Sequence, residues 1–163
     1  MSKPQRLTID LDRPESGWLR VELSFADQKY SFYPSHVPYD SICELVNALL
    51  KTLDGYDKAV VRWNDEPVEH EFVFEPGGGH VDFRVYLIND TVVGKEREQV
   101  FMFNGSTQDV VWPFWKALRD MESRQSKKEY EKQWRESFPE REMVELTRRV
   151  KELKRKAGSD KAV

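Results

Sequence analysis

Apolar and polar residues alternate along much of the first hundred positions, the period-two pattern of strands with one buried face. Short connectors separate these runs, and Pro76-Gly77-Gly78-Gly79 is the clearest hairpin loop among them. Consecutive strands joined by short loops pair in antiparallel fashion. Seven strands are predicted, over 7–11, 19–25, 29–33, 58–63, 68–74, 81–87 and 98–103.

One segment between the third and fourth strands changes to a spacing of three and four residues. This spacing places six apolar side chains on one side of a helix, at Ile42, Leu45, Val46, Leu49, Leu50 and Leu53. Asp40 is the expected N-cap of this helix, and Asp54-Gly55 is the expected end. The helix therefore falls after the third strand.

The last third of the chain is predicted to be helical. The first helix there has an apolar stripe, made of Val110, Val111, Phe114, Trp115, Leu118 and Met121. Ser106, Thr107 and Asp109 are candidate N-caps, and Asp109 is favoured because Pro113 is tolerated best in a first turn. A second helix over 140–157 carries Met143, Leu146, Val150 and Leu153 at a spacing close to that of coiled-coil seams.

These elements predict an α+β fold with two layers. We expect one mainly antiparallel sheet of about six to seven strands, one inserted helix, and a C-terminal helical extension. The predicted units are an α+β domain over 5–122, a charged helical arm or hairpin over 123–158, and a disordered tail over 159–163.

Charge is distributed unevenly along the chain. Residues 1–108 carry a formal charge of −7, whereas residues 109–163 carry +4, and the whole chain has −3. Such asymmetry indicates charged partners more than it indicates a fold. The single cysteine, Cys43, excludes an internal disulfide and a Cys-based zinc cluster. With no secretory leader and no apolar run of about 18 residues, we expect a cytoplasmic protein that does not contact membranes.

Residues suited to catalysis occur without the partners they need. His70 and His80 would approach each other if their strands pair, but Glu69 and Glu71 project to the opposite face, which leaves two metal ligands where zinc needs three or four. Cys43 near a helix start, with His36 upstream, is either a nucleophile or a core residue, and core packing is favoured. We predict no catalytic residue, no metal and no cofactor, with an unrecognised enzyme site as an alternative.

Partner-binding residues are predicted on an acidic strand face and among exposed aromatics. Glu69, Glu71 and Glu75 share one strand face and would attract a basic protein. If the other acidic faces, with Asp10, Asp12 and Glu22, join them, the sheet presents one broad acidic surface. Trp112 and Trp134 stand among charged residues, which is typical of interface anchors. Packing of these tryptophans on their own sheet is the alternative.

The final helix concentrates positive charge, at Arg148, Arg149, Lys151, Lys154, Arg155 and Lys156. A nucleic-acid-binding arm would use these side chains as phosphate contacts. A solvated, self-paired helix is favoured instead, because Glu145 and Arg149 stand at the i,i+4 spacing of helix-stabilising pairs. The seam that begins at Met143 provides a further alternative, a homodimer formed through this helix.

Four soft motifs resemble a known family. They are Gly17-Trp18-Leu19-x-Val21, the helix over 40–53, Glu66-Pro67 before Phe72-x-Phe74, and Gly79-x-Val81-x-Phe83-x-Val85. Together they resemble small bacterial immunity proteins of polymorphic-toxin systems, of the group associated with a wall-associated toxin. The resemblance covers residues 7–88 and leaves 109–163 without a counterpart. It implies a cytoplasmic inhibitor that binds a cognate toxin domain without catalysis.

Overall fold

The computed structural model describes residues 6–89 and 96–161, with the backbone alone for 159–161. Within these residues it contains seven strands and four helices. In chain order they are β1 (Thr8–Leu11), β2 (Val21–Phe25), β3 (Gln28–Phe32), α1 (Ser41–Leu53), β4 (Ala59–Asp65), β5 (Val68–Gly77), β6 (His80–Asn89), β7 (Glu96–Ser106), α2 (Thr107–Ser123), α3 (Lys127–Trp134) and α4 (Glu140–Lys161). The α+β class and the helix inserted after the third strand are confirmed.

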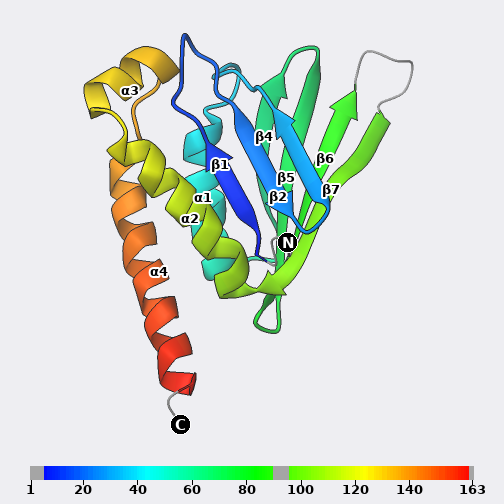
Figure 1. Ribbon diagram of the computed structural model, residues 1–163, viewed down its shortest axis with the longest axis vertical. Helices are drawn as coiled ribbons and strands as arrows, with labels where there is room; N and C mark the ends of the chain where they lie inside the picture. Colours follow the sequence, from blue (N-terminus) through cyan, green and yellow to red (C-terminus); the bar gives the residue numbers. More distant parts are fainter. Residues whose placement is uncertain (1–5, 90–95, 162–163) are drawn as a thin grey trace.

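The strands form two antiparallel sheets, so the prediction of one sheet of six to seven strands is wrong (Figure 1). The three-stranded sheet has the order β1-β2-β3, and the four-stranded sheet has the order β4-β5-β6-β7. An isolated bridge between Ser35 and Asn64 is where the chain after β3 meets β4. The core-facing side chains of both sheets belong to one buried hydrophobic cluster, to which α1 and α2 also contribute.

Phe32 shows how the two sheets pack. It comes from β3, and its ring centroid lies 5.7 Å from that of Trp63 on β4 and 6.0 Å from that of Phe72 on β5. At the other end of the interface, Phe25 on β2 meets Phe103 on β7 edge to face at 4.7 Å. Such aromatic pairs add about 0.5–1.5 kcal/mol each beyond the area they bury. The three-stranded sheet is therefore anchored to the four-stranded sheet at both ends.

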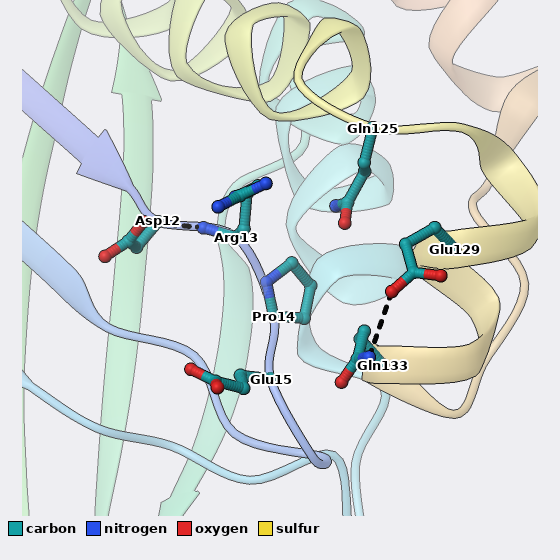
Figure 2. Close-up of a pocket in the computed structure, with 7 residues that line it drawn as sticks. All are labelled: Asp12, Arg13, Pro14, Glu15, Gln125, Glu129 and Gln133. Carbon is teal, nitrogen blue, oxygen red and sulfur yellow. Dashed lines mark hydrogen bonds between the residues drawn. The ribbon is translucent and has the colours of Figure 1, made fainter.

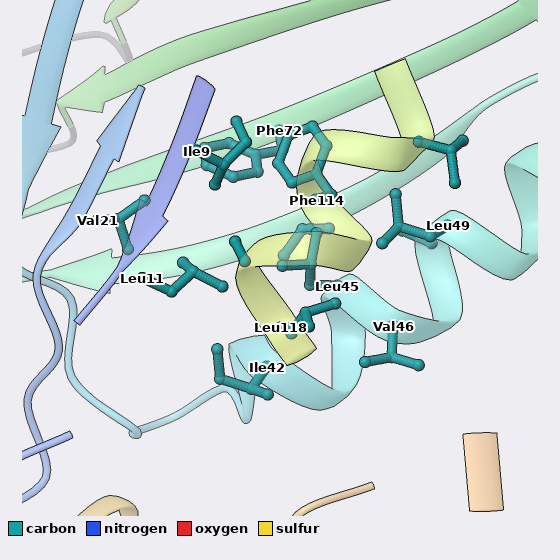
Figure 3. Close-up of a cluster of buried hydrophobic side chains, with 14 of the residues drawn as sticks. Ile9, Leu11, Val21, Ile42, Leu45, Val46, Leu49, Phe72, Phe114 and Leu118 are labelled. Carbon is teal, nitrogen blue, oxygen red and sulfur yellow. The ribbon is translucent and has the colours of Figure 1, made fainter. Parts of the chain in front are cut away.

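Helices α1 and α2 complete the same core. Figure 3 shows α1 side chains directed toward Phe72, Phe114 and the inner face of β1. Phe114 of α2 lies 5.9 Å from Phe72, ring centroid to ring centroid. The predicted N-cap of α1 is confirmed, since the Asp40 carboxylate accepts the N–H of Cys43, and the helix ends at Asp54 as expected.

The predicted start of α2 is wrong. Ser106 is the N-cap, and its hydroxyl accepts the N–H of Asp109, which lies inside the first turn. Pro113 consequently lies within the helix and beyond its first turn. Asp109 was favoured because a proline inside a helix removes one backbone hydrogen bond. The buried stripe around Phe114 offsets that loss.

The C-terminal helices pack on this domain. Trp134 of α3 and Leu146 of α4 are fully buried in the same hydrophobic cluster as α1 and α2. The indole N–H of Trp115 on α2 donates to Thr147 Oγ1 on α4 at 2.9 Å. Helix α4 continues to Lys161, so the predicted tail over 159–163 begins as helix, and residues 162–163 lie outside the described range. None of the helices in the described part of the chain is long and apolar enough to cross a membrane.

Candidate protein-binding surface

The connector between β1 and β2 makes a tight two-residue turn. Glu15 and Trp18 exchange backbone hydrogen bonds of 2.8 and 3.0 Å, and Ser16 and Gly17 between them have φ of 52° and 86°. Two successive positive φ values belong to type I′ turns, whose second central position strongly favours glycine. Glycine is also required for space, because a Cβ on Gly17 would stand 2.9 Å from Cδ2 of His36.

Helix α3 holds this turn from behind. The N–H of Gly17 donates to the carbonyl of Gln133 at 2.6 Å, and the N–H of Ser16 donates to Gln133 Oε1 at 3.0 Å. At the end of α3, the Trp134 indole N–H donates to the carboxylate of Asp40 at 2.9 Å. The connector is thus fixed by contacts with residues more than a hundred positions away in the chain, and the residue that follows the turn has a defined position.

Trp18, Arg20 and Tyr33 form what we call the aromatic surface, on the outer face of the three-stranded sheet and its extensions. Trp18 and Tyr33 are 45% and 56% exposed, whereas their neighbours Leu19 and Phe32 are buried. Continuing the β2–β3 register by one residue places Arg20 opposite Tyr33, and the bridge from Trp18 to Ser35 follows the same register. The strand alternation therefore brings all three side chains to one face.

Carboxylates on the neighbouring strands hold Arg20 in place. Its guanidinium contacts Glu22 at 2.7 Å, Asp10 at 3.2 Å and Asp12 at 3.9 Å. The hydrogen bond to Glu22 is the main reason that the pKa of Arg20 lies above its usual value. Arg20 is thus held in place by three carboxylates, on the same face as Trp18 and Tyr33.

Two hollows adjoin the turn. One, of about 330 Å³, is lined by Trp18 and Tyr33 together with Asp12, Arg13, Glu15, Ser16, Leu19 and Arg20. The other, of about 360 Å³, lies between the connector and α3 (Figure 2). Figure 2 shows the carboxylates of Asp12 and Glu15 on the side of the connector away from Gln125 and Glu129. These two acids thus also belong to the hollow between the aromatic rings.

The predicted acidic residues Glu69, Glu71 and Glu75 lie on the outward face of β5, as expected from their spacing. Two of them already have partners from the same protein. Glu69 accepts a hydrogen bond of 3.2 Å from the Tyr39 hydroxyl, and Glu71 contacts Arg97 at 3.4 Å. Their charge is therefore partly compensated.

The acidic strand faces do not join into one broad acidic surface. Asp10, Asp12 and Glu22 belong to the three-stranded sheet, where they surround Arg20. The acids of β5 belong to the other sheet, where arginines stand between them, at Arg62, Arg84 and Arg97. The division into two sheets separates acids that one sheet would have placed together.

The two predicted tryptophan anchors differ in exposure. Trp134 is fully buried and bonded to Asp40, so it packs within its own chain and is not available to a partner. Trp112 is partly exposed, stacks beside Trp115 at 4.9 Å, and lies beneath the Lys154 ammonium at 4.4 Å. Trp134 therefore follows the predicted alternative of packing within its own chain, because α3 lies against the N-terminus of α1.

Three of the six basic residues of the final helix make contacts within the chain. Arg148 bonds to Glu145 and Glu152, while Arg149 reaches Asp54 at the end of α1 at 2.7 Å. Glu145 and Arg149 were expected to pair with each other, but Glu145 pairs with Arg148 and Arg149 pairs with Asp54. Lys154 covers Trp112, and Lys151, Arg155 and Lys156 are exposed.

The apolar seam of α4 is covered by the same chain. Met143, Leu146 and Val150 are 2%, 0% and 1% exposed, in contact with the α1 and α2 layer. A homodimer that used this seam, as one alternative predicted, would have to expose the protein's own core. Val144, on the opposite side of α4, is 72% exposed.

His70 and His80, considered as a metal pair, are far apart along paired strands. His70 is opposite Leu87, whereas His80 is opposite Gly77 at the other end of the hairpin. Among the described residues, no three His, Cys, Asp or Glu side chains are grouped as metal ligands. Cys43 bonds to Asn47, and burial raises the pKa of its thiol. A raised pKa disfavours the thiolate that a nucleophile needs.

His70 is instead part of the interface between the sheets. It is 2% exposed, stacks on Phe32 at 4.2 Å, and its Nε2 lies 2.6 Å from the Tyr30 hydroxyl. Burial lowers the pKa of His70 to about 4. The imidazole is therefore neutral at neutral pH and holds β3 on β5.

The sequence pattern did not predict the aromatic surface. Trp18 was named only within the resemblance to immunity proteins, and Arg20 and Tyr33 were assigned no role. The aromatic surface could have been found from Ser16-Gly17. A two-residue turn fixes the register of the two segments that it joins, and this register places Trp18 and Arg20 on the same face as the polar residues of β1. No protein-family model, curated protein or solved structure matches this chain.

Proposed function

We propose that this protein is a non-catalytic protein-binding module that acts in the cytoplasm and neutralises a cognate toxin domain. The observation that carries the proposal is the aromatic surface, in which Trp18 and Tyr33 are 45% and 56% exposed on the same face as Arg20, which is bonded to Glu22. Tryptophan, tyrosine and arginine are the residues most enriched at binding hot spots. The inhibitory role is taken from the resemblance to immunity proteins.

The aromatic surface is favoured over the acidic face of β5 for two reasons. Its rings are 45% and 56% exposed, whereas Glu69 and Glu71 are bonded to Tyr39 and Arg97. Its backbone is also fixed by α3, so a partner would not have to order a loop. A preorganised surface loses less conformational entropy on binding.

The product of the gene next to this one is the partner to test. We expect the two purified proteins to form a complex in isothermal titration calorimetry, and co-expression to protect cells from that product. The double variant Trp18→Ala/Tyr33→Ala should weaken the complex by at least about 2 kcal/mol, roughly thirtyfold in Kd. Tyr56→Ala is the matched control, since Tyr56 is 53% exposed outside the aromatic surface.

Two results would overturn the proposal. One is the absence of both binding and protection with the adjacent gene product. The other is a complex whose Kd is unchanged in the Trp18→Ala/Tyr33→Ala variant, because that result would place the interface elsewhere. Circular dichroism of each variant checks that the fold is retained.

A further inference from the structure

We infer that the hollow between Trp18 and Tyr33 receives a cationic side chain, lysine or arginine, from a protein partner. The inference rests on the proposed function and adds to it the chemistry of the group that binds. It is carried by the combination of two aromatic rings and two carboxylates around one hollow of about 330 Å³.

The aromatic rings supply the first part of the recognition. A cation within about 6 Å of a Trp or Tyr ring face is attracted by the ring's quadrupole. The described part of the protein already has three such contacts elsewhere. The distances from cation to ring centroid are 3.8 Å for Arg97 and Tyr86, 4.1 Å for Arg62 and Tyr39, and 4.4 Å for Lys154 and Trp112.

Charge supplies the second part. Asp12 and Glu15 line the hollow together with Arg13 and Arg20. Arg20 contacts Asp10, Asp12 and Glu22, and Glu22 also contacts Lys29 at 3.6 Å. With Glu15 and Arg13 included, four carboxylates stand against three basic side chains. The local formal charge is therefore −1, which favours a cation over an anion and increases the association rate of a basic partner.

The size of the hollow also fits a side chain better than a folded element. A volume of about 330 Å³ holds one long side chain with its water, and the tight Glu15–Trp18 turn forms one wall. Because α3 holds that turn through Gln133, the wall is rigid. A lysine or arginine would lay its aliphatic stem on the rings and place its charged end near Glu15.

The test is a selection with a random twelve-residue peptide display library on the full-length protein. We expect enriched peptides to carry Lys or Arg beside an apolar residue, and to be lost on Trp18→Ala/Tyr33→Ala and on Asp12→Asn/Glu15→Gln. Tyr56→Ala should retain them. For the best synthetic peptide, replacing its basic residue by Gln should raise the calorimetric Kd at least about fivefold.

Enriched peptides that need Trp18 and Tyr33 but contain no basic residue, or that contain acidic residues instead, would overturn the inference and leave the proposed binding surface in place. Enrichment unaffected by Trp18→Ala/Tyr33→Ala, or no enrichment at all, would also overturn it. The proposed function fails separately, through the absence of binding to the adjacent gene product while the peptide selection succeeds.

Discussion

Acidification should destabilise this protein through His70. The imidazole has a pKa of about 4 in the folded protein, against about 6.5 in an unfolded chain, because it is buried, stacked on Phe32 and opposite Trp63 in the β4–β5 pair. The lowered value means that the unfolded state takes up a proton more readily than the folded state as the pH falls. Stability from this group is therefore fully present above pH 6.5 and decreases as the pH falls toward 4.

The size of the effect follows from the two pKa values. Between pH 7 and pH 5 the difference in proton binding lowers the free energy of unfolding by about 2 kcal/mol. Tyr30, whose hydroxyl faces His70 Nε2, does not titrate in this range, because burial, and then the charges of Asp65 and Glu98, raise its pKa. The carboxylates of the protein also titrate there, so the effect must be isolated by comparison.

Urea unfolding followed by tryptophan fluorescence at pH 7 and pH 5 provides that comparison. Wild type should lose about 2 kcal/mol more than His70→Gln between the two pH values, since carboxylate titration is common to both proteins. His80→Gln, a change at an exposed histidine, should behave like wild type. Parallel pH dependence in wild type and His70→Gln would refute the assignment of His70 as a neutral, buried group.

Three further substitutions test other parts of the structure by urea unfolding. Gly17→Ala should cost about 1–3 kcal/mol more than Gly78→Ala, because both glycines have positive φ but only a Cβ at Gly17 would meet His36; equal losses would contradict this contact. Leu146→Ala should cost about 2–5 kcal/mol, whereas Val144→Ala should stay within about 0.5 kcal/mol; a neutral Leu146→Ala would show that α4 does not belong to the core. Ser106→Ala should cost about 1 kcal/mol through loss of the α2 cap, and Asp109→Asn should cost much less, because its backbone N–H still reaches Ser106; the reverse order would restore Asp109 as the cap.

The aromatic surface shows why the candidate site was harder to predict than the fold. Its residues come from two connectors, one before β2 and one after β3, and they become neighbours only when β2 pairs with β3 and α3 closes on the turn. The acids of β5 were identified correctly as sharing a face, but their compensation by Tyr39 and Arg97 depends on elements that approach from other parts of the chain. Whether a residue is available to a partner thus depends on the side chains that cover it or pair with it, as well as on its own chemistry.

Local patterns in the sequence were enough to determine the strands, the face that each one buries, and the limits of α1 from Asp40 to Asp54, because these depend on residues only a few positions apart. Only the tertiary structure decided that the strands divide into two sheets facing one another, that Trp134 is buried against Asp40, and that Trp18 and Tyr33 share an exposed hollow. The physical reason is that alternation records which side of a strand is apolar, whereas the choice of the surface it packs against is made by contacts between distant segments.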